Sequence, residues 1–132
     1  MVRVLFGIFL IGHGLGHVSW FLAGFVSSFG QGQERHPPLF NDAIAASGPI
    51  GKVIGIAALL VAAAFVVGAI AFFQDATWWK DVVGAGIAGS MLVAVAWWNP
   101  AGMVSALAIG ANLGIALVTY FPLGDDLITT CL

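Results

Sequence analysis

Four long stretches of this chain are apolar and free of charge, and every charged residue lies between or beyond them. The stretches cover residues 4–29, 53–73, 82–98 and 101–121. A helix needs about 20 residues, within a range of about 17–25, to cross the hydrocarbon core of a bilayer. The pattern therefore predicts an all-α fold, a four-helix transmembrane bundle. It would form a single integral membrane domain over residues 1–132, in contact with the lipid bilayer.

Tryptophan placement supports the third of these stretches. Trp78 and Trp79 precede it, and Trp97 and Trp98 end it. From Trp79 to Trp97 a helix would extend about 27 Å at 1.5 Å per residue, close to the roughly 30 Å of the hydrocarbon core. Since aromatic residues gather at both membrane–water interfaces, the two tryptophan pairs indicate the boundaries of a membrane span.

The connections between the stretches differ in length. Residues 30–52 form one long loop, in which Pro37-Pro38 ends any preceding helix and suits the start of another. The apolar residues that follow predict a short segment of helix in the membrane interface, ending near Pro49. The last two spans are joined across Pro100 with almost no loop, which predicts an antiparallel hairpin. An even number of crossings places both termini on the same side.

Composition limits where any chemistry can lie. The chain is 61% hydrophobic and 8% charged, whereas soluble domains carry about 25% charged residues. Four spans and one loop leave no room for a soluble domain, so a site must lie in the bundle, in the loop or on a partner. The chain has no run of basic residues, so the sequence does not predict binding to nucleic acid. The single Cys131 excludes a disulfide within one chain.

Small residues recur every four positions along one face of the fourth span. Close approach of helix backbones at small residues favours packing in lipid, where the hydrophobic effect does not act between helices. This face is expected to pack against a helix of the same chain or of another. Asn112, in the middle of the span, is expected to hydrogen-bond between helices. The small residues are Gly102, Ala106, Gly110 and Gly114.

A histidine pair in the first span is the strongest chemical lead. His13 and His17 are four residues apart and so share one helix face, which Trp20 extends. Ionisable side chains within spans are rare and usually face the bundle interior or a cavity, so both rings are expected to point inward. Glycines at positions 12, 14 and 16 leave room for a neighbouring helix or a flat ligand.

Several roles fit this pair. His13, His17 and Trp20 are candidates for binding a cofactor, either haem through one axial histidine or a quinone head group. A metal ion is a further candidate if His36 folds back from the loop to complete a three-histidine site. The pair could also sense pH, or serve only as structural hydrogen-bond partners of other helices. The side chains available for that last role are Ser90, Ser105, Asn112 and Thr119.

Three short features resemble small bacterial four-helix membrane proteins of the DoxX-like type. They are an HGLxH-type motif, His13-Gly14-Leu15-Gly16-His17, the pair Trp78-Trp79, and Ala111-Asn112. The DoxX and DoxD group is linked in part to subunits of thiosulfate:quinone oxidoreductase and to helper roles in membrane redox complexes. The resemblance implies a role of that kind in a four-span layout. No catalytic motif of the oxidoreductase can be placed on this chain.

These observations predict a small polytopic membrane protein that acts as a non-catalytic subunit or helper, as a homo-oligomer or in a larger membrane complex. The alternatives are a membrane redox subunit that binds haem or quinone beside the histidine pair, and a small transporter or channel. The sequence favours a protein that is not itself an enzyme. The expected location is a bacterial or archaeal plasma membrane.

Overall fold

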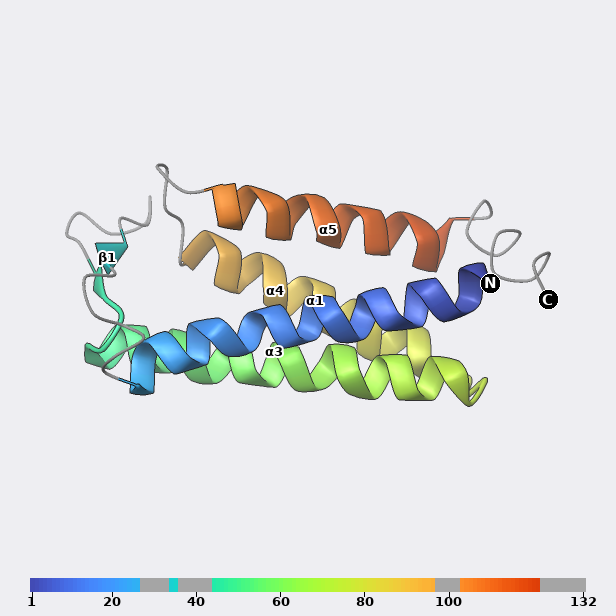
Figure 1. The fold of residues 1–132 in the computed structure, drawn as a ribbon, viewed down its shortest axis with the longest axis horizontal. Helices are drawn as coiled ribbons and strands as arrows, with labels where there is room; N and C mark the ends of the chain where they lie inside the picture. Colours follow the sequence, from blue (N-terminus) through green and yellow to red (C-terminus); the bar gives the residue numbers. More distant parts are fainter. Residues whose placement is uncertain (27–33, 36–43, 97–102, 122–132) are drawn as a thin grey trace.

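The computed structural model describes residues 1–26, 34–35, 44–96 and 103–121, and its four helices pack as one bundle (Figure 1). The predicted all-α bundle is confirmed. Three of the helices, α1, α3 and α4, are long and apolar enough to cross a membrane, whereas the apolar part of α5 is shorter. These lengths indicate an integral membrane protein, and a fourth crossing stays a prediction. The bounds are Val2–Phe25 for α1, Pro49–Phe73 for α3, Trp79–Ala96 for α4 and Met103–Tyr120 for α5.

Three of the helices, α1, α3 and α4, begin before the charge-free stretches that predicted them, whereas α5 begins inside its stretch. Arg3 lies inside α1, Lys52 lies inside α3, and Lys80 and Asp81 lie in the first turn of α4. The helix α3 begins at Pro49, because proline lacks only an N–H that the first turn leaves unpaired. A charged residue therefore marks the end of the apolar surface of a helix, whereas the helical hydrogen bonds of the backbone extend about one turn further.

The connection between α1 and α3 contains a small antiparallel sheet. Its strands are β1, Glu34–Arg35, and β2, Ile44–Ala45, with Glu34 paired to Ala45. Most of the predicted interfacial helix falls at residues 36–43, outside the described residues. Its last part is strand, not helix, because the backbone of Ile44–Ala45 pairs with β1.

Glycine brings α1 and α3 close together. A Cβ atom at Gly14 of α1 would lie 2.9 Å from the Cβ of Phe65 and 3.0 Å from the carbonyl oxygen of Ala62 on α3. In the other direction, a Cβ at Gly55 of α3 would lie 3.3 Å from the Cα of Phe21 on α1. Such backbone proximity is the usual basis of helix packing in lipid. Among the described helices, these two make the most extensive contact.

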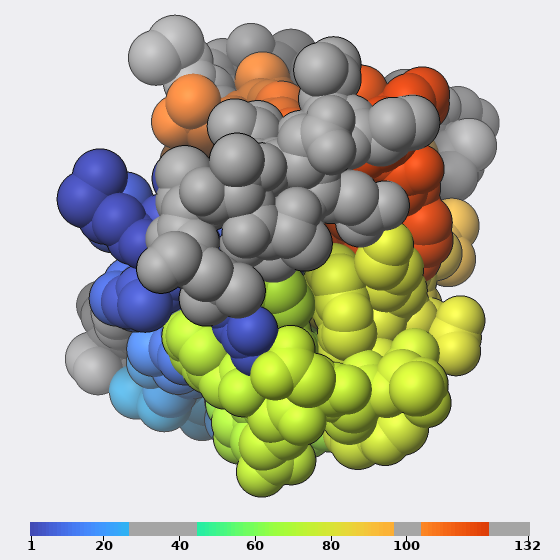
Figure 2. Space-filling view, turned by 90° about the vertical axis from the view of Figure 1, so that its right-hand side faces the viewer, coloured from blue at the N-terminus to red at the C-terminus, as the bar shows by residue number. Residues whose placement is uncertain are grey.

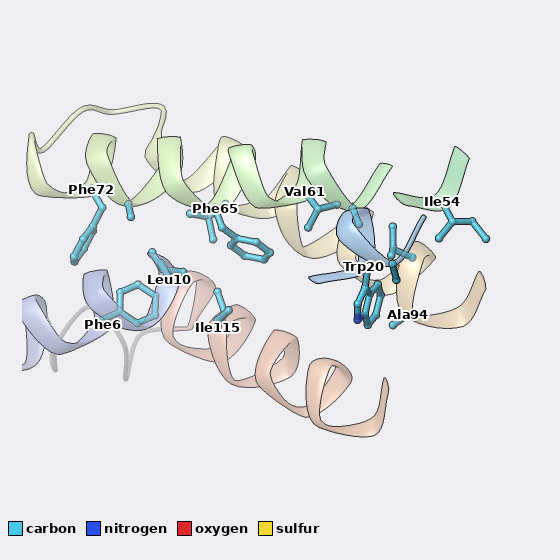
Figure 3. Packing of buried hydrophobic residues seen from close by; sticks show 14 of the residues in the cluster. Phe6, Leu10, Trp20, Ile54, Val61, Phe65, Phe72, Ala94 and Ile115 are labelled. Carbon is cyan, nitrogen blue, oxygen red and sulfur yellow. The ribbon is translucent and has the colours of Figure 1, made fainter. Parts of the chain in front are cut away.

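One aromatic side chain occupies the middle of the core. Phe65 of α3 is fully buried, and Figure 3 shows it together with Leu10 of α1 and Ile115 of α5. The same figure places Phe6 beside Phe72, whose rings meet edge to face with centroids 5.5 Å apart. Three helices therefore contribute to one apolar layer.

Arg3 fastens the start of α1 to the end of α3. Its Nη2 donates to the carbonyl oxygens of Phe72 at 3.1 Å and Phe73 at 3.2 Å, and pairs with Asp75 Oδ1 at 2.6 Å. Carbonyls in the last turn of a helix lack helical partners and carry partial negative charge, which favours a cation there. Asp75 has a φ of 54°, the left-handed conformation that commonly ends a helix. Arg3 thus joins two helix ends as well as adding a basic charge beside the first span.

A second contact joins α4 and α5 at the same end of the bundle. The hydroxyl of Tyr120, in the last turn of α5, donates to the carbonyl oxygen of Lys80 at 2.7 Å. Figure 2 views this end and shows the start of α1, the turn from α3 to α4 and the end of α5. Successive helices are thus antiparallel, and α1 begins where α5 ends, as expected if both termini lie on one side.

Candidate functional site

The histidine-bearing face of α1 points into the bundle. His17 has 3% of its surface exposed, and Trp20 is buried beside it. His13 is half-buried. Both imidazoles make hydrogen bonds to other helices. The expectation that the two rings turn inward is therefore confirmed.

Four side chains from three helices form one hydrogen-bonded network. His13 Nε2 lies 3.0 Å from Asn112 Oδ1 of α5, and Asn112 Nδ2 donates to Ser90 Oγ of α4 at 2.7 Å. Ser90 Oγ in turn lies 2.9 Å from His17 Nε2. All three distances between donor and acceptor atoms lie in the ordinary range for hydrogen bonds. The network, defined as His13, Asn112, Ser90 and His17, begins and ends on α1.

Aromatic rings surround the two imidazoles. Phe65 meets His13 edge to face at 4.8 Å between centroids and stacks on His17 at 6.2 Å. Trp20 meets His17 edge to face at 5.2 Å, and Phe9 stacks on His13 at 6.2 Å. The network is therefore enclosed by apolar material that strengthens its electrostatic interactions. The sequence alone did not single out Phe65, because it is one apolar residue in an apolar stretch.

The face of α5 that packs against the bundle carries polar residues at every seventh position. Ser105, Asn112 and Thr119 are buried, as is Ile115 between the last two. A seven-residue spacing covers two helical turns and keeps these positions on one side. Asn112 therefore joins α5 to both α1 and α4, whereas Thr119 Oγ1 has no hydrogen-bond partner among the described residues.

The predicted small-residue face lies on the opposite side of α5. Ala106, Gly110 and Gly114 are exposed, and no heavy atom lies within 4 Å of a Cβ built at Gly110 or Gly114. Gly102 falls outside the described residues. Polar residues, not this stripe, face the bundle interior, so α5 does not pack along the stripe against any other part of the chain that the structure describes. Contact of the stripe with another chain stays a prediction.

A groove separates α1 from α5 beside the network. It has a volume of about 260 Å³. Its walls include His13, His17 and Trp20, the three candidates for cofactor binding, and a cofactor there stays a prediction. The lining residues from α1 are His13, Gly16, His17, Ser19 and Trp20, and those from α5 are Val104, Leu107, Ala108 and Ala111.

The three glycines around the histidines have different surroundings. Gly14 faces α3, as its short contacts to Phe65 and Ala62 show. A Cβ at Gly12 or Gly16 would meet nothing within 4 Å. One glycine thus admits a neighbouring helix, and Gly16 leaves space at the groove.

The metal candidate finds no support among the described residues. Within them, no three or more His, Cys, Asp or Glu side chains gather in a group that could hold an ion. His36, which would complete the proposed three-histidine site, lies outside the described residues. The described site is therefore a histidine, serine and asparagine network beside an apolar groove.

Comparison of the chain with protein-family models, with curated proteins and with solved structures finds no match. The comparisons therefore identify no family. The structure shows a four-helix protein in which three described helices are long and apolar enough to span a membrane.

Proposed function

We propose that this chain is a small non-catalytic subunit or helper of a larger membrane complex in a bacterial or archaeal plasma membrane, as a homo-oligomer or beside other subunits. The observation that carries the proposal is the outward face of α5, where Gly110 and Gly114 meet no other described residue. The resemblance to DoxX-like proteins, among which helper roles in membrane redox complexes occur, points in the same direction.

At Gly68 and Gly89, by contrast, glycine is placed where another helix approaches. A Cβ at Gly68 of α3 would lie 2.7 Å from Val83 Cγ2, and one at Gly89 of α4 would lie 2.8 Å from Val61 Cγ2. Glycine within a helix costs roughly 1 kcal/mol relative to alanine, so its use at close contacts has a compensating benefit. The glycines on the outward face of α5 have no such benefit within one chain. A helix of a partner would supply it.

Replacing Gly110 with leucine should weaken association and leave the single chain folded. The added side chain enters open space in the monomer but would hold a partner helix away. We expect the association constant to fall about tenfold or more, which corresponds to about 1.4 kcal/mol. Native mass spectrometry from mild detergent and thermal unfolding would measure the two effects.

The matched control is Ala63→Leu, because Ala63 is exposed on α3, away from α5. This change should alter neither the oligomer distribution nor the unfolding temperature. If Gly110→Leu and Ala63→Leu give the same distribution as the unchanged protein, the outward face of α5 is not an association surface.

A second candidate function is a membrane redox subunit that binds a quinone or haem beside His13 and His17. The observation that favours it is the groove between α1 and α5, whose walls include both histidines and Trp20. Pockets that enclose a drug-sized ligand have volumes of about 300–1,000 Å³, and the groove here has about 260 Å³. Its size suits a single-ring head group better than a whole haem.

A further inference from the structure

The helices α1 and α5 have little direct contact beside the network. The helix α1 packs mainly on α3 and α5 packs mainly on α4, so a groove of about 260 Å³ lies between α1 and α5. His13 Nε2 of α1 and Asn112 Oδ1 of α5 lie 3.0 Å apart and join the two helices beside that groove. We call the groove and this hydrogen bond the α1–α5 seam. Its polar contact thus includes a side chain whose charge depends on pH.

The two histidines lie next to each other at the seam. The rings of His13 and His17 meet edge to face with centroids 5.2 Å apart, and both residues line the groove. Histidine is the side chain whose charge ordinarily changes between pH 5 and pH 8. A protonated imidazole carries a hydrogen on both nitrogens, so the protonated state is the same whichever neutral tautomer each ring has at higher pH. The seam can therefore gain up to two positive charges over that range.

No described side chain beside the two rings would balance those charges. The neighbours from the other helices are Phe65 of α3, Ser90 of α4 and Asn112 of α5, and none of the three ionises. The Asp, Glu, Lys and Arg residues that the structure describes lie in the α1–α3 connection, in the turn after α3 or in the first turn of a helix. A buried charge without an opposite charge is costly, and two like charges this close repel each other. Protonated rings are therefore more stable in an open seam that admits water than in the closed one.

The inward face of α5 carries polar groups along its whole length. Ser105, Asn112 and Thr119 are buried on this face at a spacing of seven residues. Thr119 Oγ1 is buried without a hydrogen-bond partner among the described residues, and an unpaired polar atom destabilises the state that buries it. Water admitted along this face would offer Thr119 a partner. The surface that an open seam exposes is thus suited to contact with water.

We propose that the α1–α5 seam is a pH-dependent opening in the bundle. Uptake of protons by His13 and His17 moves α5 away from α1 and lets water reach the two rings. The helix α1 keeps its place on α3, because the backbones of these two helices approach closely at Gly14 and Ala62. The movement goes beyond the proposed function, since it requires one copy of the chain and no partner.

The direction of the pH dependence follows from which state binds more protons. The closed bundle holds both rings neutral, whereas an open seam exposes them to water, where imidazole has an ordinary pKa of about 6.5. A pH above this value therefore favours the closed state, and a lower pH favours the open one. Below about pH 6.5 the ratio of open to closed bundles should rise by up to about tenfold per pH unit for each histidine that gains a proton.

Distances between pairs of spin labels measure the opening directly. One pair, Leu15→Cys on α1 and Leu113→Cys on α5, lies on exposed positions that do not line the groove. The matched pair, Leu15→Cys and the exposed Leu60→Cys on α3, reports on the helices that should stay together. Both are placed in the full-length chain with Cys131→Ser, in lipid nanodiscs, and diluted with unlabelled protein. Between pH 8 and pH 5 the α1–α5 pair should gain a longer distance and the α1–α3 pair should not. An unchanged α1–α5 distance, or an equal change in both pairs, would overturn the proposal.

Variants that do not titrate assign the effect to the two histidines. Glutamine keeps an amide that can hydrogen-bond but takes up no proton in this range, so His13→Gln with His17→Gln should stay closed at pH 5. Asp75→Asn is the matched control, because it removes a carboxylate at the end of α3, where Asp75 pairs with Arg3, and it should open as the unchanged protein does. Circular dichroism at pH 8 checks that the double variant folds. If it does not, His13→Gln alone takes its place and should lower the pH dependence to that of one proton. A glutamine variant that opens like the unchanged protein would contradict the proposal.

Discussion

Replacing Gly14 with leucine should disrupt the packing of α1 against α3. Even a Cβ at this position would lie 2.9 Å from the Cβ of Phe65 and 3.0 Å from the carbonyl oxygen of Ala62. The carbonyl belongs to the backbone of α3 and cannot turn aside as a side chain can. Overpacking typically costs about 1–3 kcal/mol and occasionally more, and a whole leucine at a backbone contact belongs at the upper end. We expect the free energy of unfolding to fall by about 3 kcal/mol or more.

Gly12→Leu is the control for this change. It puts the same side chain two residues away on the same helix, where no heavy atom lies within 4 Å of the Cβ. Circular dichroism during unfolding in mixed detergent would compare the two. Similar unfolding midpoints for both variants would contradict the close α1–α3 packing.

Asn112→Ala should give the second large effect. It removes the acceptor of His13 Nε2 and the donor to Ser90 Oγ, so two hydrogen bonds between helices are lost together. Single hydrogen bonds between membrane helices contribute about 0.6 kcal/mol on average and up to about 1.7 kcal/mol. The loss of both should lower the free energy of unfolding by about 1–3 kcal/mol. The same unfolding assay would measure it.

Thr119→Val provides a matched comparison on the same face of α5. Thr119 is buried like Asn112, but its Oγ1 has no hydrogen-bond partner in the part of the chain that the structure describes. Exchange of its hydroxyl for a methyl group of similar shape should be nearly neutral, within about 0.5 kcal/mol. If Asn112→Ala is no more destabilising than Thr119→Val, the network contributes little to the stability of the bundle.

Much of the fold follows from where charge is absent. Four uncharged stretches predicted four helices, and the turn of both histidines toward the interior followed from the cost of leaving imidazoles in lipid. Asn112 could be identified as an interhelical contact for the same reason. These features depend on whether a side chain is more stable in lipid or in contact with protein, and the polarity of each residue type decides this.

The choice of packing face on α5 did not follow from the sequence in the same way. Small residues at 106, 110 and 114 and polar residues at 105, 112 and 119 both form a continuous side of the helix. Either side could have met α4, because close backbone approach and hydrogen bonding both favour contact in lipid. The packing face is decided by Ser90 and His13, which lie far from Asn112 in sequence and both hydrogen-bond to it.

The groove was equally inaccessible to sequence reasoning. It exists because α1 packs mainly on α3 while α5 packs mainly on α4, so that α1 and α5 lie apart over part of their length (Figure 1). The sequence identified His13, His17 and Trp20 as site candidates but not the α5 residues opposite them. Which helices adjoin is a property of the whole assembly, and short motifs do not encode it.

The central claim is that the chain is a membrane-embedded bundle in which the start of α1 and the end of α5 lie on the same side. Its most direct test is the accessibility of single cysteines, Val2→Cys and Asp126→Cys, each in a Cys131→Ser background. A membrane-impermeant thiol reagent is added to sealed vesicles, from outside alone and then after permeabilisation. The account predicts that both positions react from the same side of the membrane. Reaction of the two positions from opposite sides would contradict it.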